Sequence, residues 1–144
     1  MVIFSQQDQD TIVQAISLAE SHTSGEIRLV VERKLKQGEA LDRATHYFDK
    51  LNMGATALHN GVLIYLAHDD HAYAIIGDSG IHKKVPADFW ETVSSHMLDH
   101  FKEGNVARGL IAGITEAGEQ LGIYFPKGQD DVNELPDDLH FGEN

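Results

Sequence analysis

The chain has 144 residues, no cysteine, and 23 acidic against 11 basic residues, which gives a formal net charge of −12. This length is typical of one domain and is sufficient for a hydrophobic core without disulfide support. The lack of cysteine excludes disulfides, thiolate metal sites and cysteine nucleophiles. The acidic balance disfavours nucleic acids and anionic membrane surfaces, because both require a basic face. It suits divalent cations or a basic partner, although solubility alone also explains it.

The first residues do not resemble a targeting signal. Residues 1–6 contain neither a basic segment nor a long apolar one, and no apolar run approaches the roughly 20 residues of a membrane span. We therefore expect a cytoplasmic protein without direct membrane insertion.

The first half of the chain predicts two helices and a strand. Ser5 and Asp8 resemble a capping box, and apolar residues then recur at helical spacing over residues 6–21. Residues 26–33 are rich in β-branched side chains, which favours a strand buried on both faces. A second amphipathic helix is predicted from four apolar residues at helical spacing, Leu41, Ala44, Phe48 and Leu51.

A hairpin follows in the middle of the chain. Residues 61–67 form a nearly continuous apolar run, and residues 72–76 return after the polar turn at 68–71. Residues 77–80, Gly-Asp-Ser-Gly, end the second strand of this hairpin in a loop.

Two more helices are predicted before an acidic tail. Pro86 suits the first turn of a helix, whose apolar face is formed by Phe89, Trp90, Val93, Met97 and Phe101. The last helix carries apolar residues over 106–121, and Gly109 and Gly113 indicate close helix packing. From Pro126 onward the chain has six acidic residues and one lysine.

The order helix, strand, helix, strand, strand, helix, helix predicts an α/β fold. The strand–helix–strand unit places the first two strands parallel, and the hairpin places the third antiparallel. Helices must cover both faces of so apolar a sheet, which gives an α/β/α three-layer sandwich. We expect one domain over 1–125 and an acidic tail over 126–144 that packs on it.

The chain contains several short strings in a fixed order: Thr23-Ser24-Gly25-Glu26-Ile27, Asn60-Gly61-Val62-Leu63-Ile64-Tyr65, Gly77-Asp78-Ser79-Gly80-Ile81, Phe89-Trp90, Phe125-Pro126 and Asn133-Glu134-Leu135-Pro136-Asp137. Together they resemble the TPM domain family in its short, stand-alone bacterial form. The resemblance implies a small mixed sheet of about four strands, so a fourth strand is expected near residues 81–85. It also implies divalent-metal binding, most often calcium, and a weak acid phosphatase activity in some members.

Three oxygen-bearing side chains are expected at one end of the sheet. Glu26 and Asn60 stand where the two parallel strands begin, and Asp78 follows the strand that runs back. Carboxylate and amide oxygens are the ligands of calcium and magnesium. The tail could add Glu134 and Asp137, with Asp131 and Asp138 as further candidates, if it folds back to this end. The competing interpretation is that Glu26 acts as a cap or pairs with a lysine, that Asn60 closes a turn and that Asp78 caps the loop.

Other residue patterns are less specific. His68, Asp69, Asp70 and His71 could hold zinc, but a hairpin turn is also polar for reasons of solvation. His96 and His100 lie four apart on a predicted helix, without the glutamate of a zinc-protease helix beside them. Ser79 lacks the glycine pattern of a nucleophile elbow.

These observations predict a calcium- or magnesium-binding module that changes its binding or regulatory state with metal. The alternative is a weak metal-dependent acid phosphatase, and a third possibility is a structural module without metal. An unidentified protein partner is expected for the first.

Overall fold

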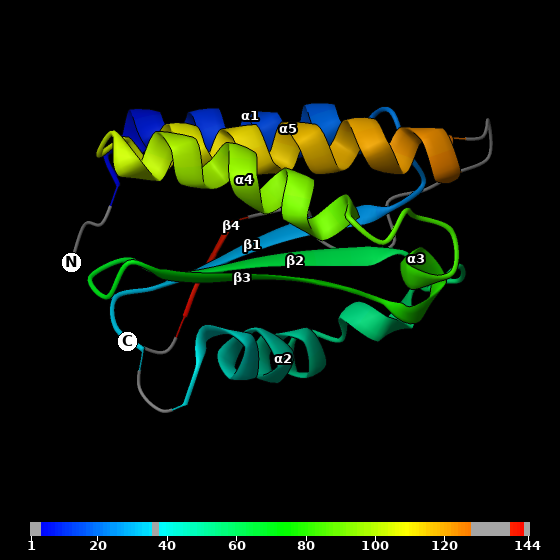
Figure 1. Ribbon diagram of the computed structural model, residues 1–144, viewed down its shortest axis with the longest axis horizontal. Helices are drawn as coiled ribbons and strands as arrows, with labels where there is room; N and C mark the ends of the chain where they lie inside the picture. The colour runs from blue at the N-terminus through cyan, green and yellow to red at the C-terminus, as the bar shows by residue number, and fades with distance from the viewer. Residues whose placement is uncertain (1–3, 36–37, 128–138, 143–144) are drawn as a thin grey trace.

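The computed structural model describes residues 4–35, 38–127 and 139–142 and arranges them in three layers (Figure 1). Helices α1 (Gln6–Glu20), α4 (Phe89–Lys102) and α5 (Val106–Tyr124) cover one face of a sheet. Helix α2 (Ala40–Lys50) covers the other. The short helices η1 (Met53–Ala55) and α3 (Ser79–His82) lie in the connections. The predicted α/β/α sandwich is confirmed.

Within the part of the chain that the structure describes, four strands form one mixed sheet in the order β3-β2-β1-β4. They are β1 (Glu26–Glu32), β2 (Gly61–Ala67), β3 (Ala72–Gly77) and β4 (Leu139–Phe141). Strand β1 is parallel to β2 and β4, and β2 is antiparallel to β3. The predicted parallel pair and hairpin are therefore confirmed.

The fourth strand is not where we expected it. Residues 81–85 do not form a strand, because Asp78 caps a helix there: its Oδ1 accepts a hydrogen bond from the N–H of Ser79, 2.7 Å away. The strand is instead β4, and its three residues are too few to show the alternation by which a strand is recognised.

Helix α4 begins later than predicted. Its N-cap is Asp88, and Pro86 lies in the turn before it, where its carbonyl accepts from the N–H of Phe89. The packing of α5 was predicted correctly at two glycines. A side chain at Gly109 would lie 2.3 Å from the ring of Phe101, and one at Gly113 would lie 2.5 Å from the sulfur of Met97.

The two faces of β1 differ in chemistry. Ile27, Leu29 and Val31 join the large core beneath α1, α4 and α5. The alternate residues face α2, and they are Glu26, Arg28, Val30 and Glu32. All of these except Val30 are charged. The whole strand is buried, as predicted.

Helix α2 packs on the sheet through most of the predicted stripe: Ala44 is buried, and Phe48 and Leu51 are partly buried against the same core. Tyr47 is also buried, whereas Leu41 is 54% exposed. Among the described residues, no helix is long and apolar enough to cross a membrane.

Candidate functional site

Two connections meet at the end of the sheet where β1 and β2 begin and β3 finishes, which we call the starting end. The N–H of Glu26 donates to the carbonyl of Asn60, and the N–H of Asp78 donates to that of Gly61. Gly80 allows the two loops to approach: a Cβ there would lie 2.2 Å from the carbonyl oxygen of Leu58. The backbones of Glu26, Asn60 and Asp78 thus converge as the topology predicted.

Asp78 has the most distinctive environment of the three. Its Oδ1 caps α3, and its side chain is 15% exposed. Its Oδ2 is buried and lies 3.3 Å from Nδ1 of His59, but no described residue makes a hydrogen bond to it. A buried carboxylate oxygen without a hydrogen bond carries a desolvation cost that a cation would offset, either a metal ion or His59 in its protonated form.

The side chains of Glu26 and Asn60 are held in different ways. Glu26 is buried and lies on the α2 side of the sheet by strand alternation. The Nδ2 of Asn60 donates to Oγ of Ser24, 3.2 Å away. A further carboxylate at this end, which sequence reasoning missed, is that of Glu20. It is buried, and its Oε2 accepts from the N–H of Ile27 at 2.7 Å.

The described residues do not complete a metal cage on their own. Among residues 4–35, 38–127 and 139–142, no group of three or more His, Asp or Glu side chains is placed to hold a metal ion. The tail candidates, Asp131, Glu134, Asp137 and Asp138, lie outside the described residues.

At the other end of the sheet, side chains of the polar turn at residues 68–71 contact other groups of the protein. Asp69 pairs with Arg33 at 3.0 Å and with His68 at 3.2 Å, and these two hydrogen bonds lower the pKa of Asp69. Asp70 accepts from the N–H of Leu35 at 2.6 Å. These bonds agree with the turn interpretation rather than with zinc. His96, on α4, lies 3.6 Å from Glu116 on α5.

A buried polar cluster that we did not predict lies between β1 and α2. It consists of Glu32, Arg43, Tyr47 and Tyr65, and we call it the Glu32 cluster. Arg43 binds the Glu32 carboxylate through two nitrogens, at 3.0 and 2.9 Å. The hydroxyl groups of Tyr47 and Tyr65 each donate to one of its oxygens at 2.7 Å.

The electrostatics of the Glu32 cluster follow from these four bonds. Burial alone raises the pKa of Glu32, but the hydrogen bonds from Arg43, Tyr47 and Tyr65 and the charge of Arg43 outweigh it and lower this pKa to about 2. Burial and the same carboxylate raise the pKa of Tyr65. The carboxylate is therefore ionised and fully engaged at neutral pH, which suits a structural role and not that of a base.

Strand β4 closes the cluster on its remaining side. The ring of His140 lies 5.9 Å from that of Tyr47, and burial lowers the pKa of His140, as do the charges of Arg28 and Lys50. A side chain at Gly142 would lie 2.3 Å from Cγ of Glu32. The sequence contained one indication of the Glu32 cluster. Charged residues at alternate positions of β1 indicate that one face of this buried strand is polar.

The family of the chain follows from comparison with known proteins. The geometry defines the class of protein: it is an α/β/α domain with a mixed sheet whose connecting loops meet at the starting end. The family model of the TPM domain matches residues 2–120, and the chain therefore belongs to the TPM domain family.

Solved structures support the same fold. The BA42 protein of Bizionia argentinensis, solved by NMR, is 42% identical, with a TM-score of 0.92 over 98% of this chain and 97% of that one. The N-terminal domain of a P. gingivalis protein is 18% identical, with a TM-score of 0.71, over 85% of this chain and 79% of that one. The N-terminal domain of cg2496 from Corynebacterium glutamicum is 14% identical, with a TM-score of 0.69, over 92% of this chain and 82% of that one. A search of curated proteins gave no match.

Proposed function

We propose that this TPM domain binds calcium or magnesium at the starting end of the sheet and acts as a metal-responsive binding or regulatory module. The observation that carries the proposal is the buried Oδ2 of Asp78, which receives no hydrogen bond from the described residues. Glu26 and Asn60 are the further ligands from the body of the domain, and Glu134 and Asp137 are those from the tail.

The chain path supports a contribution from the tail. Pro126 forms a β-bridge with Thr23, and the N–H of Ser24 donates to the carbonyl of Phe125 at 2.9 Å. The tail therefore leaves the domain beside Ser24, whose Oγ binds Asn60. It returns as β4, which runs parallel to β1 and so enters the sheet from the starting end. The described chain thus stops at Lys127 near the starting end and re-enters the sheet as β4 from the same end, at the edge opposite to β3.

The chemistry of hard cations accounts for this set of residues. Calcium takes six to eight oxygen ligands, and magnesium takes six with several waters. Two carboxylates and an amide from the domain are too few for either ion, so tail carboxylates and backbone carbonyls complete the sphere. Binding to the folded form alone would shift the loops towards one arrangement, and a protein partner would recognise that arrangement.

A titration of chelator-treated protein with calcium and magnesium, followed by amide NMR, tests the proposal. We expect the shifts to centre on Glu26, Asn60, Asp78 and residues 128–138. Asp78→Asn retains the oxygen that caps α3 and removes the charge, so the fold should persist while affinity falls at least tenfold, or about 1.4 kcal/mol. Asp99→Asn, at an exposed position on α4, is the matched control. Equal affinities for the two variants, or no shifts at all, would contradict the proposal.

The alternative activity, a weak metal-dependent acid phosphatase, has its own test. Hydrolysis of p-nitrophenyl phosphate should then require added metal and disappear in Asp78→Asn. Metal binding without turnover would leave the binding module as the function.

A further inference from the structure

Strand β3 is an edge strand with an open row of backbone groups. The N–H of Asp78 donates to Gly61, and in an antiparallel ladder the residues that face the partner alternate from there. Ala72, Ala74 and Ile76 therefore direct their backbone groups to β2. Tyr73 and Ile75 direct theirs outward, where no other described residue makes a hydrogen bond to them.

Strand β3 contains no proline, no charged residue and no bulge that would prevent pairing with another strand. Natural edge strands are often interrupted by proline, lysine or a bulge. Strand β3 reads Ala-Tyr-Ala-Ile-Ile-Gly and pairs with β2 in unbroken register over all six residues. It is therefore a ready template for one more strand.

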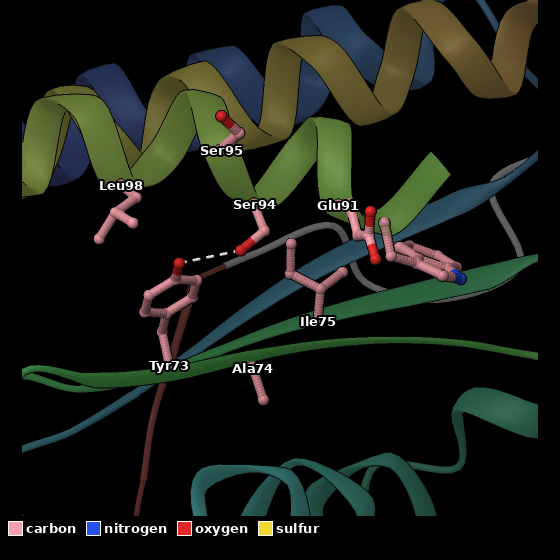
Figure 2. Close-up of a pocket in the computed structure, with 8 residues that line it drawn as sticks. Tyr73, Ala74, Ile75, Glu91, Ser94, Ser95 and Leu98 are labelled. Atoms are coloured by element: carbon pink, nitrogen blue, oxygen red, sulfur yellow. Dashed lines mark hydrogen bonds between the residues drawn. The ribbon is translucent and has the colours of Figure 1, made fainter. Parts of the chain in front are cut away.

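A groove of about 670 Å³ runs along this edge beneath α4 (Figure 2). Its floor includes Tyr73, Ala74 and Ile75, and its wall on α4 includes Glu91 and Leu98. Figure 2 shows the side chains of Tyr73 and Ile75 pointing towards α4, whereas that of Ala74 points away from the groove. Ala74 thus lines the groove with its main chain, so the backbone of the strand borders the groove.

The groove offers apolar surface at the end that lies opposite to Glu91. Leu98 is 38% exposed although it lies beside the ring of Tyr73. The same two residues line a smaller cavity of about 170 Å³, which continues towards Phe101 and Val106. An inserted strand would cover this surface with every second side chain.

The charged residue in the groove is acidic. Glu91 is exposed in its wall, and a shallow hollow beside it is lined by Glu91 and by Asp88. No lysine or arginine is among the described residues that line the groove or this shallow hollow, whereas Lys102 lines the smaller cavity beyond Leu98. A basic side chain at this position would be attracted, and the net charge of −12 adds to that attraction.

We propose that the β3–α4 groove binds an extended peptide segment of a partner protein by strand addition. The segment pairs with the outward backbone groups of Tyr73 and Ile75. It places alternate apolar residues beneath Leu98 and a lysine or arginine beside Glu91. A second copy of this chain is a poorer occupant, since two chains of charge −12 repel each other. The proposal does not depend on metal binding.

The rate of hydrogen exchange at the backbone amides of β3 gives the first test. Without peptide, the amides of Tyr73 and Ile75 should exchange with solvent much faster than those of Ala74 and Ile76, which are bonded to β2. The peptide acetyl-Lys-Thr-Val-Thr-Val-Thr-Lys-amide carries valine and lysine on one face, and its two lysines allow either strand direction. When added at roughly 1 mM, a concentration that detects weak binding, it should protect Tyr73 and Ile75 selectively.

Modified peptides test whether the main chain makes the contact. One control has N-methyl groups on the valines, and the other has them on the threonines, so each removes one of the two alternating rows of N–H donors. One of the two controls should bind like the parent peptide, and the other should not bind. The identity of the control that fails to bind also shows whether the peptide runs parallel or antiparallel to β3. Equal binding by all three peptides would overturn strand addition.

Protein variants test the groove itself. Leu98→Lys should weaken peptide binding about tenfold or more, whereas Leu18→Lys, the same change at an exposed position on α1, should leave it unchanged. Glu91→Lys should weaken binding by a factor that shrinks as salt is added. The proposal is overturned if the wild type does not bind the peptide at that concentration. It is equally overturned if light scattering gives a dimer in which Tyr73 and Ile75 are already protected.

Discussion

At the scale of the residue, the buried carboxylate of Glu32 contributes to the stability of the α2 layer. Glu32 is inaccessible to solvent, and removing a charge from water costs several kcal/mol unless the charge is paired and hydrogen-bonded. Four donors on two elements meet this requirement, so any loss of the charge or of one donor leaves the remaining groups poorly satisfied.

We expect a marked loss of stability in acid. The pKa of Glu32 falls from 4.5 to about 2 on folding, so its contribution is complete above pH 4.5 and is lost as the pH falls through about 2. The difference corresponds to about 3 kcal/mol. Urea unfolding between pH 6 and pH 2 should show this loss, and the Glu32→Gln variant should show a smaller pH dependence. Identical pH profiles for the two proteins would contradict the assignment.

Removing one donor from the cluster should cost more than removing a comparable hydroxyl elsewhere. Tyr65→Phe deletes a buried hydrogen bond to a charged oxygen, and we expect it to lower the free energy of unfolding by about 1.5–3 kcal/mol. Tyr73→Phe, which deletes the hydrogen bond to Ser94, is the control and should cost only about 0.5–1.5 kcal/mol. Denaturant midpoints measure both, and a larger loss in the control would show that the charge adds nothing.

At the scale of the element, the three-helix layer depends on close contact between α1 and α5. A Cβ on Gly118 would lie 2.5 Å from Cβ of Ala19 and 2.9 Å from its Cα, so a change of rotamer cannot relieve the contact. Gly118→Ala should therefore destabilise the fold by about 1–2 kcal/mol, although alanine gains about 1 kcal/mol in helix propensity.

Gly54→Ala provides the matched control for this substitution. Gly54 has open space around its Cα and no positive φ, so we expect a change within about 0.5 kcal/mol. Thermal unfolding of both variants tests the difference, and similar melting temperatures would indicate that α1 and α5 adjust without cost.

The elements that sequence could predict are those with a sufficiently long pattern. Helices α1 and α5 show apolar periodicity, β1 is rich in β-branched residues and β2 is a nearly continuous apolar run, and the structure confirms all four. Strand β4 has three residues, and α3 has four, so neither carries a period. The placement of Asp78, Glu26 and Asn60 at one end followed from strand direction alone. The Glu32 cluster did not, because its partners come from α2 and β2, and only the tertiary fold brings them to β1.

At the scale of the whole molecule, the acidic tail contributes a strand to the sheet of the domain. From Pro126 onward it contributes about −5 of the net charge, yet it returns to supply a strand of the sheet. Strand β4 pairs with Leu29, Val30 and Val31, and the N–H of Gly142 donates to Val31 at 2.8 Å. Strand β4 thereby pairs with backbone groups on the side of β1 that faces away from β2.

Removing residues 128–144 therefore tests whether the tail is part of the folding unit. The shortened chain loses the β4 pairing and the residues that cover Tyr47 and Glu32, and we expect the free energy of unfolding to fall by about 2–5 kcal/mol. Urea unfolding in the presence of a chelator separates this effect from any loss of metal ligands. An unchanged midpoint in chelator would mean that the sheet is stable with three strands. The tail would then matter to the starting end alone, through Glu134 and Asp137.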